Sequence, residues 1–314
     1  MTGTVVDRVL SPVRSRLIET LAGRSDEVPA WILRLEDGED AGFFAPGSAA
    51  WAVHGGMPTL VAGVRALLLQ ALHPGALAGV RDHSRYREDP LGRLAGTIQW
   101  IHTVTFGSRG QAAAASDMVR VLHRRVTGRY VDGHGAERPY SASDPDLARW
   151  VHLSFTDAFL TAHERWGDPI PGGPDAYVAD WATAADLMGV EDPPRTAAGL
   201  RAQLDAITDA GDLRGGPEVD EIVRFIRRAP LRPVLRPSYR IVFRAAVSTL
   251  DPRHRLLLGL PRTPWEPLLP IHSATATVLR GSRILLGPHT QAELAARRRL
   301  ARLAGAAADP DARG

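Results

Sequence analysis

Most of the chain consists of helical segments separated by proline and glycine, and this pattern restricts its fold more than any other feature. Within the segments, apolar residues recur at three- and four-residue spacing, which is typical of amphipathic helices, and strand signals are scarce. Asp89-Pro90 and Gly107 have the form of a helix start and a helix end. We therefore expect an all-α protein, with helices at 5–21, 58–72, 91–106, 112–126, 145–166, 175–188, 196–207, 219–227, 239–249, 266–278 and 290–303.

The connecting stretches predict how the chain is divided. Gly128 is expected to end the helix at 112–126, and the turn-rich residues 129–140 predict a loop or a short hairpin. A chain of 314 residues that is 44% hydrophobic can bury one sizeable core. We expect a single main multi-helix domain at 45–300, preceded by a helix and a connecting segment at 1–44 and followed by a disordered tail at 301–314.

Three residue types are missing, and their absence excludes several kinds of chemistry. All 38 basic residues other than histidine are arginines, and the chain has no lysine, asparagine or cysteine. Schiff bases, lysine-dependent phosphate loops, thiolate nucleophiles, disulfides and thiolate metal sites are therefore impossible. An iron atom could be held only by histidine, tyrosine, methionine or a carboxylate.

Charge and hydropathy limit the partners. The net charge is only +3, and the basic residues are spread among 35 carboxylates, so nucleic acid is not an expected partner. No apolar run reaches the roughly 18 residues of a membrane-spanning helix. Residues 1–24 lack the apolar core of a secretion signal, which favours a cytoplasmic protein. The arginine run at 297–302 is expected to form the solvated face of the last helix.

Arg93 and Thr97 are one helical turn apart, so both project from one face of the helix expected at 91–106. Trp100 extends that apolar face. A guanidinium buried there needs an anionic partner, because desolvation of an unpaired cation is costly. The carboxylate of a cofactor would supply one. The alternative is an ion pair with an acidic residue of the preceding loop, at Asp82, Glu88 or Asp89.

His123 lies near the end of the helix expected at 112–126, flanked on one face by Val119 and Val126. This spacing directs the imidazole toward apolar surroundings. A neutral helical histidine facing a dry pocket is a common proximal iron ligand. On the pattern alone, a hydrogen-bonded core histidine is the commoner interpretation, and only the family resemblance described below favours a ligand.

Two further histidines belong to the candidate set. His152 shares a helix face with Phe155 and Phe159, where it could line a pocket or simply fill the core. His73 precedes Pro74 at the end of an apolar helix, where an imidazolium would be favoured by the helix dipole and could cap free carbonyls. Capping is therefore the expected role of His73.

The order and spacing of these residues resemble the catalytic domain of the rubber oxygenase/MpaB family. The resemblance covers roughly residues 45–194, about half of the chain. The positions that carry it are Leu72-His73-Pro74, Tyr86, Asp89-Pro90, Arg93, Thr97, His123, Gly128, Tyr140-Ser141-Ala142 and Trp150-Val151-His152.

The resemblance implies an all-helical fold with a partly globin-like core, and a haem b cofactor with which dioxygen is used to cleave carbon–carbon double bonds of isoprenoids. It implies that His123 is the proximal iron ligand and that Arg93 and Thr97 line the haem pocket. His152 matches a further family motif, and we assign it to cofactor binding.

One departure from the family pattern concerns the distal side of the iron. In the rubber-cleaving branch a lysine between the arginine and the threonine caps the iron, and the matching residue here is Gly96. Because the chain has no lysine, we expect the distal site to be open, water-bound or capped by another residue such as a histidine. Without a secretion signal, a small hydrophobic substrate is expected rather than a polymer.

Three functional hypotheses follow. The leading one is a haem-dependent oxygenase, with Arg93 and Thr97 in catalytic and cofactor-binding roles and His123 on the iron. The first alternative is a non-catalytic helical module that binds a hydrophobic ligand without metal. The second is a non-haem iron protein, which would require His73, His123 and His152 to converge.

Overall fold

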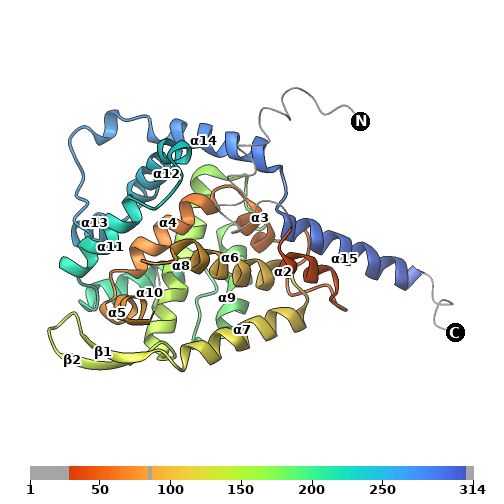
Figure 1. Cartoon of the computed structure of the whole chain (residues 1–314), viewed down its shortest axis with the longest axis horizontal. Coiled ribbons are helices and arrows are strands. Elements are labelled where there is room, and N and C mark those ends of the chain that lie inside the picture. Colours follow the sequence, from red (N-terminus) through yellow and green to blue (C-terminus); the bar gives the residue numbers. More distant parts are fainter. Residues whose placement is uncertain (1–27, 84–86, 309–314) are drawn as a thin grey trace.

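The computed structural model describes residues 28–83 and 87–308 and consists predominantly of α-helices (Figure 1). The expectation of an all-α protein is confirmed. Within the described ranges, the β-structure consists of one two-stranded sheet. The helix expected at 5–21, Tyr86 of the family pattern and residues 309–314 lie outside the described residues.

The elements of the first half of the chain are α2 (Ala30–Leu33), η1 (Arg34–Glu36), α3 (Ala49–Gly55), α4 (Thr59–Gln70), α5 (Pro74–His83), α6 (Pro90–Phe106) and α7 (Arg109–His123). In this half, the longest described helices are α6 and α7.

Local sequence explains where α6 and α7 begin. The Asp89 side chain accepts a hydrogen bond from the Gly92 backbone at 2.9 Å, and Pro90 occupies the first turn. Ser108 and Gln111 form a capping box at the start of α7. Only Gly107 and Ser108 separate the two helices, so the chain turns back sharply between them.

The expected helix at 112–126 is wrong at both ends. The helix begins at Arg109 and ends at His123, and β1 (Thr127–Val131) pairs antiparallel with β2 (Glu137–Ser141). Gly128 is a strand residue and not a helix terminator. It lies opposite Tyr140, whose ring atoms would be only 2.7 Å from an added Cβ.

The second half contains the longest helices. Its elements are α8 (Pro145–Trp166), α9 (Gly173–Met188), α10 (Ala197–Asp209), α11 (Pro217–Arg227), η2 (Pro233–Leu235), α12 (Arg236–Ser248), α13 (Pro252–Leu257), η3 (Glu266–Leu268), α14 (Ile271–Leu286) and α15 (Gln291–Ala308). The helix expected at 266–278 is divided into η3 and α14, because Pro270 interrupts it. Residues 301–308 continue α15, so this part of the expected tail is helical.

The core is organised around the pair α4 and α8, which share the most extensive contact; α12 covers α4, and α9 and α10 cover α8. Arg65 of α4 forms an ion pair with Asp157 of α8. Trp150 of α8 and Trp181 of α9 are fully buried in the same core. The described helices therefore enclose one continuous apolar core, as a single domain requires.

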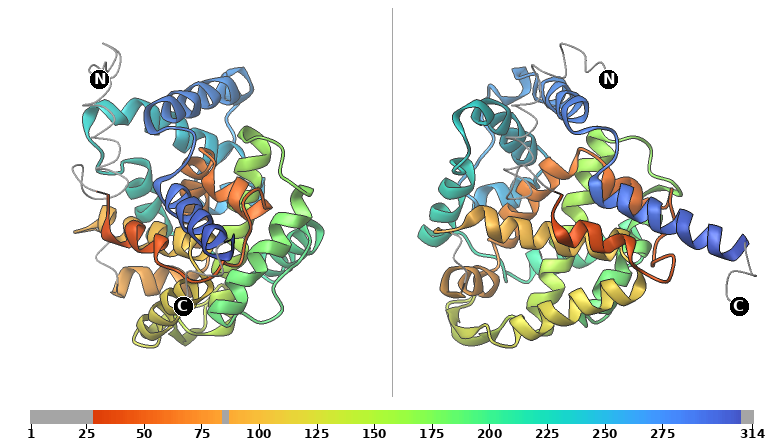
Figure 2. Two further views of the ribbon diagram at one scale, coloured as in Figure 1. Left: turned by 90° about the vertical axis from the view of Figure 1, so that its right-hand side faces the viewer. Right: turned by 45° about the vertical axis from the view of Figure 1, so that its right-hand side comes forward.

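Helix α15 is attached by its arginines and then projects away from the body of the fold (Figure 2). Arg299 is only 1% exposed and donates hydrogen bonds to the carbonyls of Leu35 at 2.6 Å and Phe106 at 2.8 Å. Arg298 bonds to Glu36. The expectation that the run at 297–302 is a solvated face is therefore wrong for Arg299, because it satisfies carbonyls at the ends of two other segments.

Candidate functional site

The site predicted from the sequence lies on the helix pair α6 and α7. Trp100 of α6 donates a hydrogen bond from Nε1 to Ser116 Oγ of α7 at 3.1 Å. The chain turns back between the helices, so positions equally far from this bond on either side face one another. Seven residues before Trp100 is Arg93, and seven residues after Ser116 is His123. The two candidate residues thus stand opposite each other at the far end of the pair.

The two helices separate toward this end. Figure 1 shows them diverging toward the start of α6 and the end of α7. Near the turn, α6 is mostly buried, as at Val104 and Phe106, whereas its first turns carry exposed side chains. The Arg93–His123 end is therefore the accessible end of the pair.

The imidazole of His123 is free to act as a ligand. His123 lies on the same stripe of α7 as Ala112 and Ser116, which are buried against the fold, and it is partly exposed itself. Burial, together with the positive charge of Arg93, lowers the pKa of His123. No residue in the described part of the chain hydrogen-bonds its ring. A neutral imidazole with an unused ring nitrogen is the form that binds a metal.

Arg93 is exposed at the start of α6. Its guanidinium forms no ion pair or hydrogen bond with any residue that the structure describes. Asp82 accepts a hydrogen bond from Tyr140 at 2.9 Å, and Asp89 caps α6. The alternative expectation, an ion pair between Arg93 and an acidic residue of the preceding loop, is therefore not observed.

The expected burial of Arg93 and Thr97 is wrong, because both side chains are solvent-accessible. Protein atoms around Arg93 nevertheless lower its pKa by desolvation. Protein atoms thus lie beside the Arg93 side chain but do not shield it from solvent. Thr97 donates a hydrogen bond to the Arg93 carbonyl at 3.3 Å, which leaves its oxygen able to accept another.

Several positions on the central helices also lack covering side chains. Leu67 of α4 and Val151 of α8 are 42% and 40% exposed, although the helices around them are mostly buried. Gly63 of α4 and Gly96 of α6 would meet no atom within 4 Å if they carried a Cβ. Figures 1 and 2 show α4, α6 and α8 gathered at the centre of the fold. An apolar ligand could cover these faces.

His152 lies in the packed part of α8. It is 8% exposed, and burial lowers its pKa to about 4. The Thr156 hydroxyl is 3.5 Å from Nε2, which is a weak contact. Among the described residues, no hydrogen bond or ring contact joins His152 to Arg93, Thr97 or His123. The structure thus brings Arg93, Thr97 and His123 to one helix pair and does not connect His152 to them.

His73 is a cap, but of a different kind from the one expected. Its Nδ1 accepts a hydrogen bond from the Gly75 backbone at 3.2 Å, at the start of α5. Burial is the main cause that lowers the pKa of His73, so the expected imidazolium is wrong and the neutral ring acts as the acceptor. Within residues 28–83 and 87–308, no group of three or more His, Asp or Glu side chains is arranged to hold a metal. The hypothesis of a convergent three-histidine iron site is therefore wrong.

A buried polar network at His54 was missed from the sequence. Its Nδ1 lies 2.7 Å from Thr105 Oγ1 and its Nε2 lies 3.0 Å from the Tyr177 hydroxyl, with Trp181 packed against the ring. The partners are 51 and 123 residues away in the sequence, so no local pattern could indicate them. The network links α3, α6 and α9 behind the site.

A pocket lies elsewhere in the fold. It has a volume of about 560 Å³ and is formed by the α3–α4 turn, the end of α8, α14 and the start of α15. Arg93, Thr97, His123 and His152 do not line it. Its walls mix apolar residues such as Trp51 with charged ones such as Arg280 and Glu293.

The fold and the Arg93–His123 pair define the class as an all-helical domain with a histidine and an arginine exposed at the open end of a helix pair. Comparison with family models matches residues 51–308 to the family described as ER-bound oxygenase mpaB/B'/rubber oxygenase, catalytic domain. The chain belongs to this family of oxygenase catalytic domains. Searches of curated proteins and of solved structures found no match.

No single helix in the described ranges is long and apolar enough to cross a bilayer. The helices α3 and α4 reach the required length and composition only together, and the chain bends by 90° between them.

Proposed function

We propose that this protein is a haem b-dependent oxygenase that uses dioxygen to oxidise a small hydrophobic substrate, isoprenoid or lipid-like. The observation that carries the proposal is the Arg93–His123 pair. A neutral imidazole and a guanidinium, neither of which has a hydrogen-bonding or ion-pairing partner among the described residues, face the same open end of α6 and α7. These are the two contacts that haem takes from a protein, an axial nitrogen for iron and a cation for a propionate.

Each residue has a distinct role in this proposal. His123 would ligate iron through a ring nitrogen that burial and the Arg93 charge keep deprotonated at neutral pH. Arg93 would bind a propionate through charge-assisted hydrogen bonds. Thr97, one turn along α6, would accept or donate a hydrogen bond at the same face. His152, held neutral by burial, would adjoin the cofactor from α8.

Bound haem b would supply an iron centre that binds and reduces dioxygen, chemistry that the side chains alone cannot perform. The chain's own residues His123 and Arg93 would hold the cofactor. Gly96 has no side chain, and a Cβ there would meet no atom within 4 Å. No lysine exists to close the distal side. Substrate could therefore approach without first displacing a lysine ligand.

The apolar nature of the substrate is supported by the exposed side chains of the central helices. Leu67 and Val151 would lose contact with water if an aliphatic chain lay against α4 and α8. The same observation favours the second candidate function, a non-catalytic module that binds a hydrophobic ligand without metal.

One experiment separates the two functions. The protein should be expressed with a haem precursor in the medium, purified, and measured for visible absorption and iron content. Oxygenase function predicts a Soret band and about one haem per chain. Iron well below one atom per chain, in protein that is folded and has been incubated with haem, would leave only the ligand-binding module.

A further inference from the structure

The end of the molecule opposite the tip of α15 is strongly basic. Residues 222–265 contain ten arginines and a single carboxylate, Asp251. Asp251 is already bonded to Arg253 of α13. Arg253 also pairs with Asp205 and Asp209, and Arg255 pairs with Glu266, so the local positive charge comes mainly from the arginines of α11 and α12, although the whole chain has a net charge of only +3.

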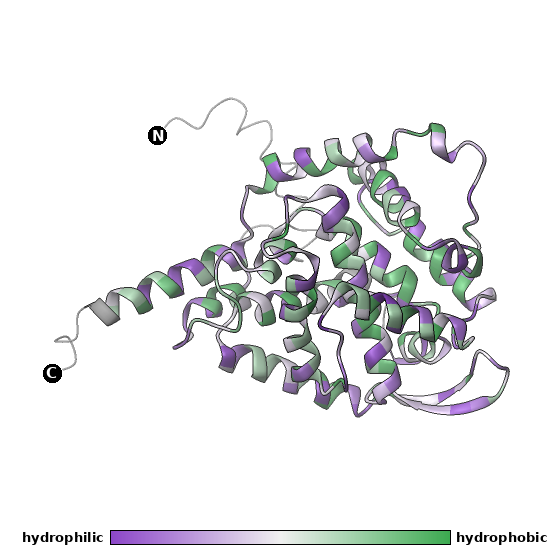
Figure 3. Cartoon of the chain, turned by 180° about the vertical axis from the view of Figure 1, so that it is seen from behind, coloured by the Kyte–Doolittle hydropathy of each residue, from purple (hydrophilic) through white to green (hydrophobic). Residues whose placement is uncertain are grey.

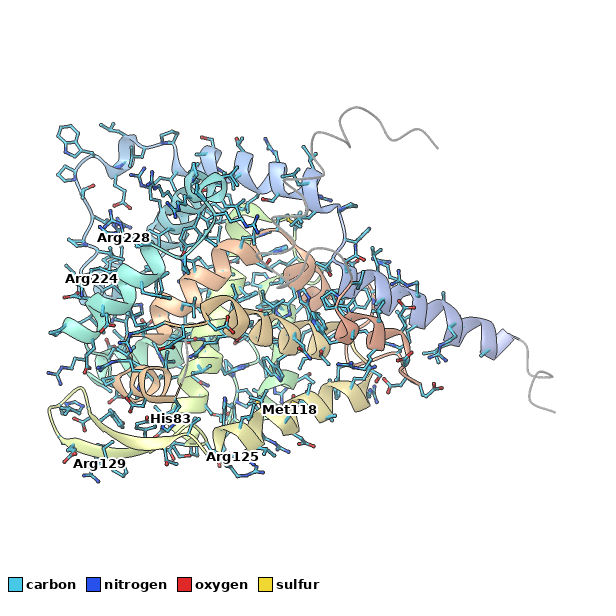
Figure 4. All side chains as sticks on the ribbon, in the orientation of Figure 1. His83, Met118, Arg125, Arg129, Arg224 and Arg228 are labelled. Carbon is cyan, nitrogen blue, oxygen red and sulfur yellow. The ribbon has the colours of Figure 1, made fainter. Side chains whose placement is uncertain are left out.

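The arginines of α11 and α12 are arranged toward solvent. On α12, Arg236, Arg240 and Arg244 recur every fourth residue and form one exposed stripe, while residues such as Phe243 are buried. Figure 4 shows Arg224 and Arg228 at the end of α11, on the side of the molecule where α12 also lies. Within the described part of the chain, no ion pair is formed by Arg224, Arg227, Arg228, Arg240 or Arg244.

Exposed apolar side chains accompany these arginines. In the connection between α13 and α14, Trp265 and Leu268 are 71% and 75% exposed, and Leu269 is 43% exposed. Val234 of η2 is 51% exposed. Figures 1 and 3 place this connection at the edge of the molecule, next to α11 and α12. We call the exposed arginines and apolar residues of 224–244 and 262–269 the basic–apolar end.

The connection that carries Trp265 is held in place by a buried ion pair. Arg255, which is 3% exposed, donates hydrogen bonds from its two terminal guanidinium nitrogens, Nη1 and Nη2, to the two Glu266 carboxylate oxygens, each at 2.7 Å. It also donates to the carbonyls of Leu260 at 2.9 Å and Pro261 at 3.3 Å. A bidentate pair of this kind fixes backbone geometry. The apolar residues beside Glu266 are thus displayed by a rigid support.

The combination identifies one kind of partner. Moving exposed Leu and Trp side chains from water into the interfacial zone of a bilayer is favourable. Surrounding arginines are attracted electrostatically to anionic headgroups. Nucleic acid would use the arginines but would leave Leu268 and Leu269 in water. We propose that the basic–apolar end docks the protein reversibly on anionic membrane surfaces, with Trp265 and Leu268 inserted and the arginines of α11 and α12 on lipid phosphates.

Membrane docking would place the protein where apolar compounds concentrate. This consequence rests on the proposed function, but the docking itself does not, because none of its residues belongs to the α6–α7 site. Failure of one proposal therefore leaves the other standing.

Sedimentation of the full chain with vesicles tests the docking. Vesicles of phosphatidylcholine with about 30% phosphatidylglycerol should bind the protein, pure phosphatidylcholine should bind it at least tenfold more weakly, and salt should weaken binding. The double variant Trp265→Ser/Leu268→Ser should lose at least tenfold in affinity. Arg240→Glu/Arg244→Glu should lose as much and show a smaller salt dependence.

Matched controls are available on other faces. Leu33→Ser/Met118→Ser removes apolar side chains that are 50% and 67% exposed, and Arg195→Glu/Arg201→Glu reverses two exposed arginines. Both controls should bind vesicles as the wild type does. Equal binding to neutral vesicles, or equal losses in the controls, would overturn the proposal. So would a wild-type dimer that Trp265→Ser/Leu268→Ser converts to monomer, or RNA binding tighter than vesicle binding and insensitive to Trp265→Ser/Leu268→Ser.

Discussion

Arg93 and His123 stand opposite each other across α6 and α7, each seven residues from the hydrogen bond between Trp100 and Ser116. The charge of Arg93 contributes to lowering the pKa of His123. One helix pair thus presents a neutral imidazole together with a cation that no described residue pairs.

His123→Ala should abolish haem binding, because it removes the proposed iron ligand. We expect the Soret band to disappear and bound haem to fall by at least tenfold. His83→Ala is a suitable control, since His83 is exposed and bonds only the Thr127 carbonyl at 2.8 Å among described residues. Normal haem content in His123→Ala would show that the ligand lies elsewhere.

Arg93→Ala should raise the pKa of His123 in haem-free protein, because a nearby positive charge disfavours the imidazolium. Burial is the larger cause, so the pKa should stay below that of a free histidine. Titration of the ring protons by NMR measures the change. Arg120→Ala, which removes an arginine paired with Asp117, should leave the pKa unchanged. An unaltered titration in Arg93→Ala would mean that the two side chains are not close.

His152 should make the protein less stable in acid. Burial lowers its pKa from 6.5 to about 4, so the unfolded chain binds a proton more readily than the folded chain. Stability is then lost as the pH falls from about 6.5 to about 4, by at most roughly 1.4 kcal/mol per pH unit from this residue. Urea unfolding at several pH values should show a shallower loss for His152→Gln than for the wild type. Parallel curves would contradict the assignment.

Arg299→Met should destabilise the fold by roughly 2–5 kcal/mol, because it leaves the buried carbonyls of Leu35 and Phe106 without donors. Arg298→Met, which removes a half-exposed pair with Glu36, should cost about 1 kcal/mol or less. Denaturant midpoints compare the two. Similar small effects would mean that α15 is not held by Arg299.

Replacing Gly96 and Gly128 with alanine should change the stability of the protein in opposite directions. Gly96→Ala should stabilise haem-free protein by about 0.5–1 kcal/mol, since position 96 is helical and a Cβ there meets nothing within 4 Å. Gly128→Ala should destabilise it, because the Cβ would lie 2.7 Å from the Tyr140 ring. Thermal melting of both variants provides the comparison, and a destabilised Gly96→Ala would show that the space at 96 is filled.

Apolar periodicity, together with the positions of proline, glycine and capping residues, predicted the helices well where the apolar stripe was long. The starts after Asp89 and at Pro145 agree with the structure, because proline and a capping residue mark them locally. The end of α7 was predicted wrongly. Residues 124–126 continue a helical pattern, but pairing of Thr127 with Ser141 places the chain in a strand, and this pairing depends on residues far along the chain.

The candidate residues were found by sequence, but their surroundings were not. Arg93, Thr97 and His123 were selected from spacing and family resemblance, and spacing also implied that Arg93 was buried. The structure shows Arg93 and Thr97 accessible, because α6 and α7 diverge at that end. Arg299 was expected in solvent and is buried, since its carbonyl partners lie 264 and 193 residues away.

The sequence by itself determined the helical class, the family, and the absence of lysine and cysteine chemistry, because these depend on residue types and local spacing. Tertiary structure alone decided that Arg93 faces His123 with no acidic partner among the described residues, that three histidines do not converge, and that Trp265 is exposed at the same end of the molecule as the arginine stripe of α12. Such relationships depend on which faces the helices bury against one another. Which side chains are buried depends on the whole fold and cannot be deduced from a local sequence pattern.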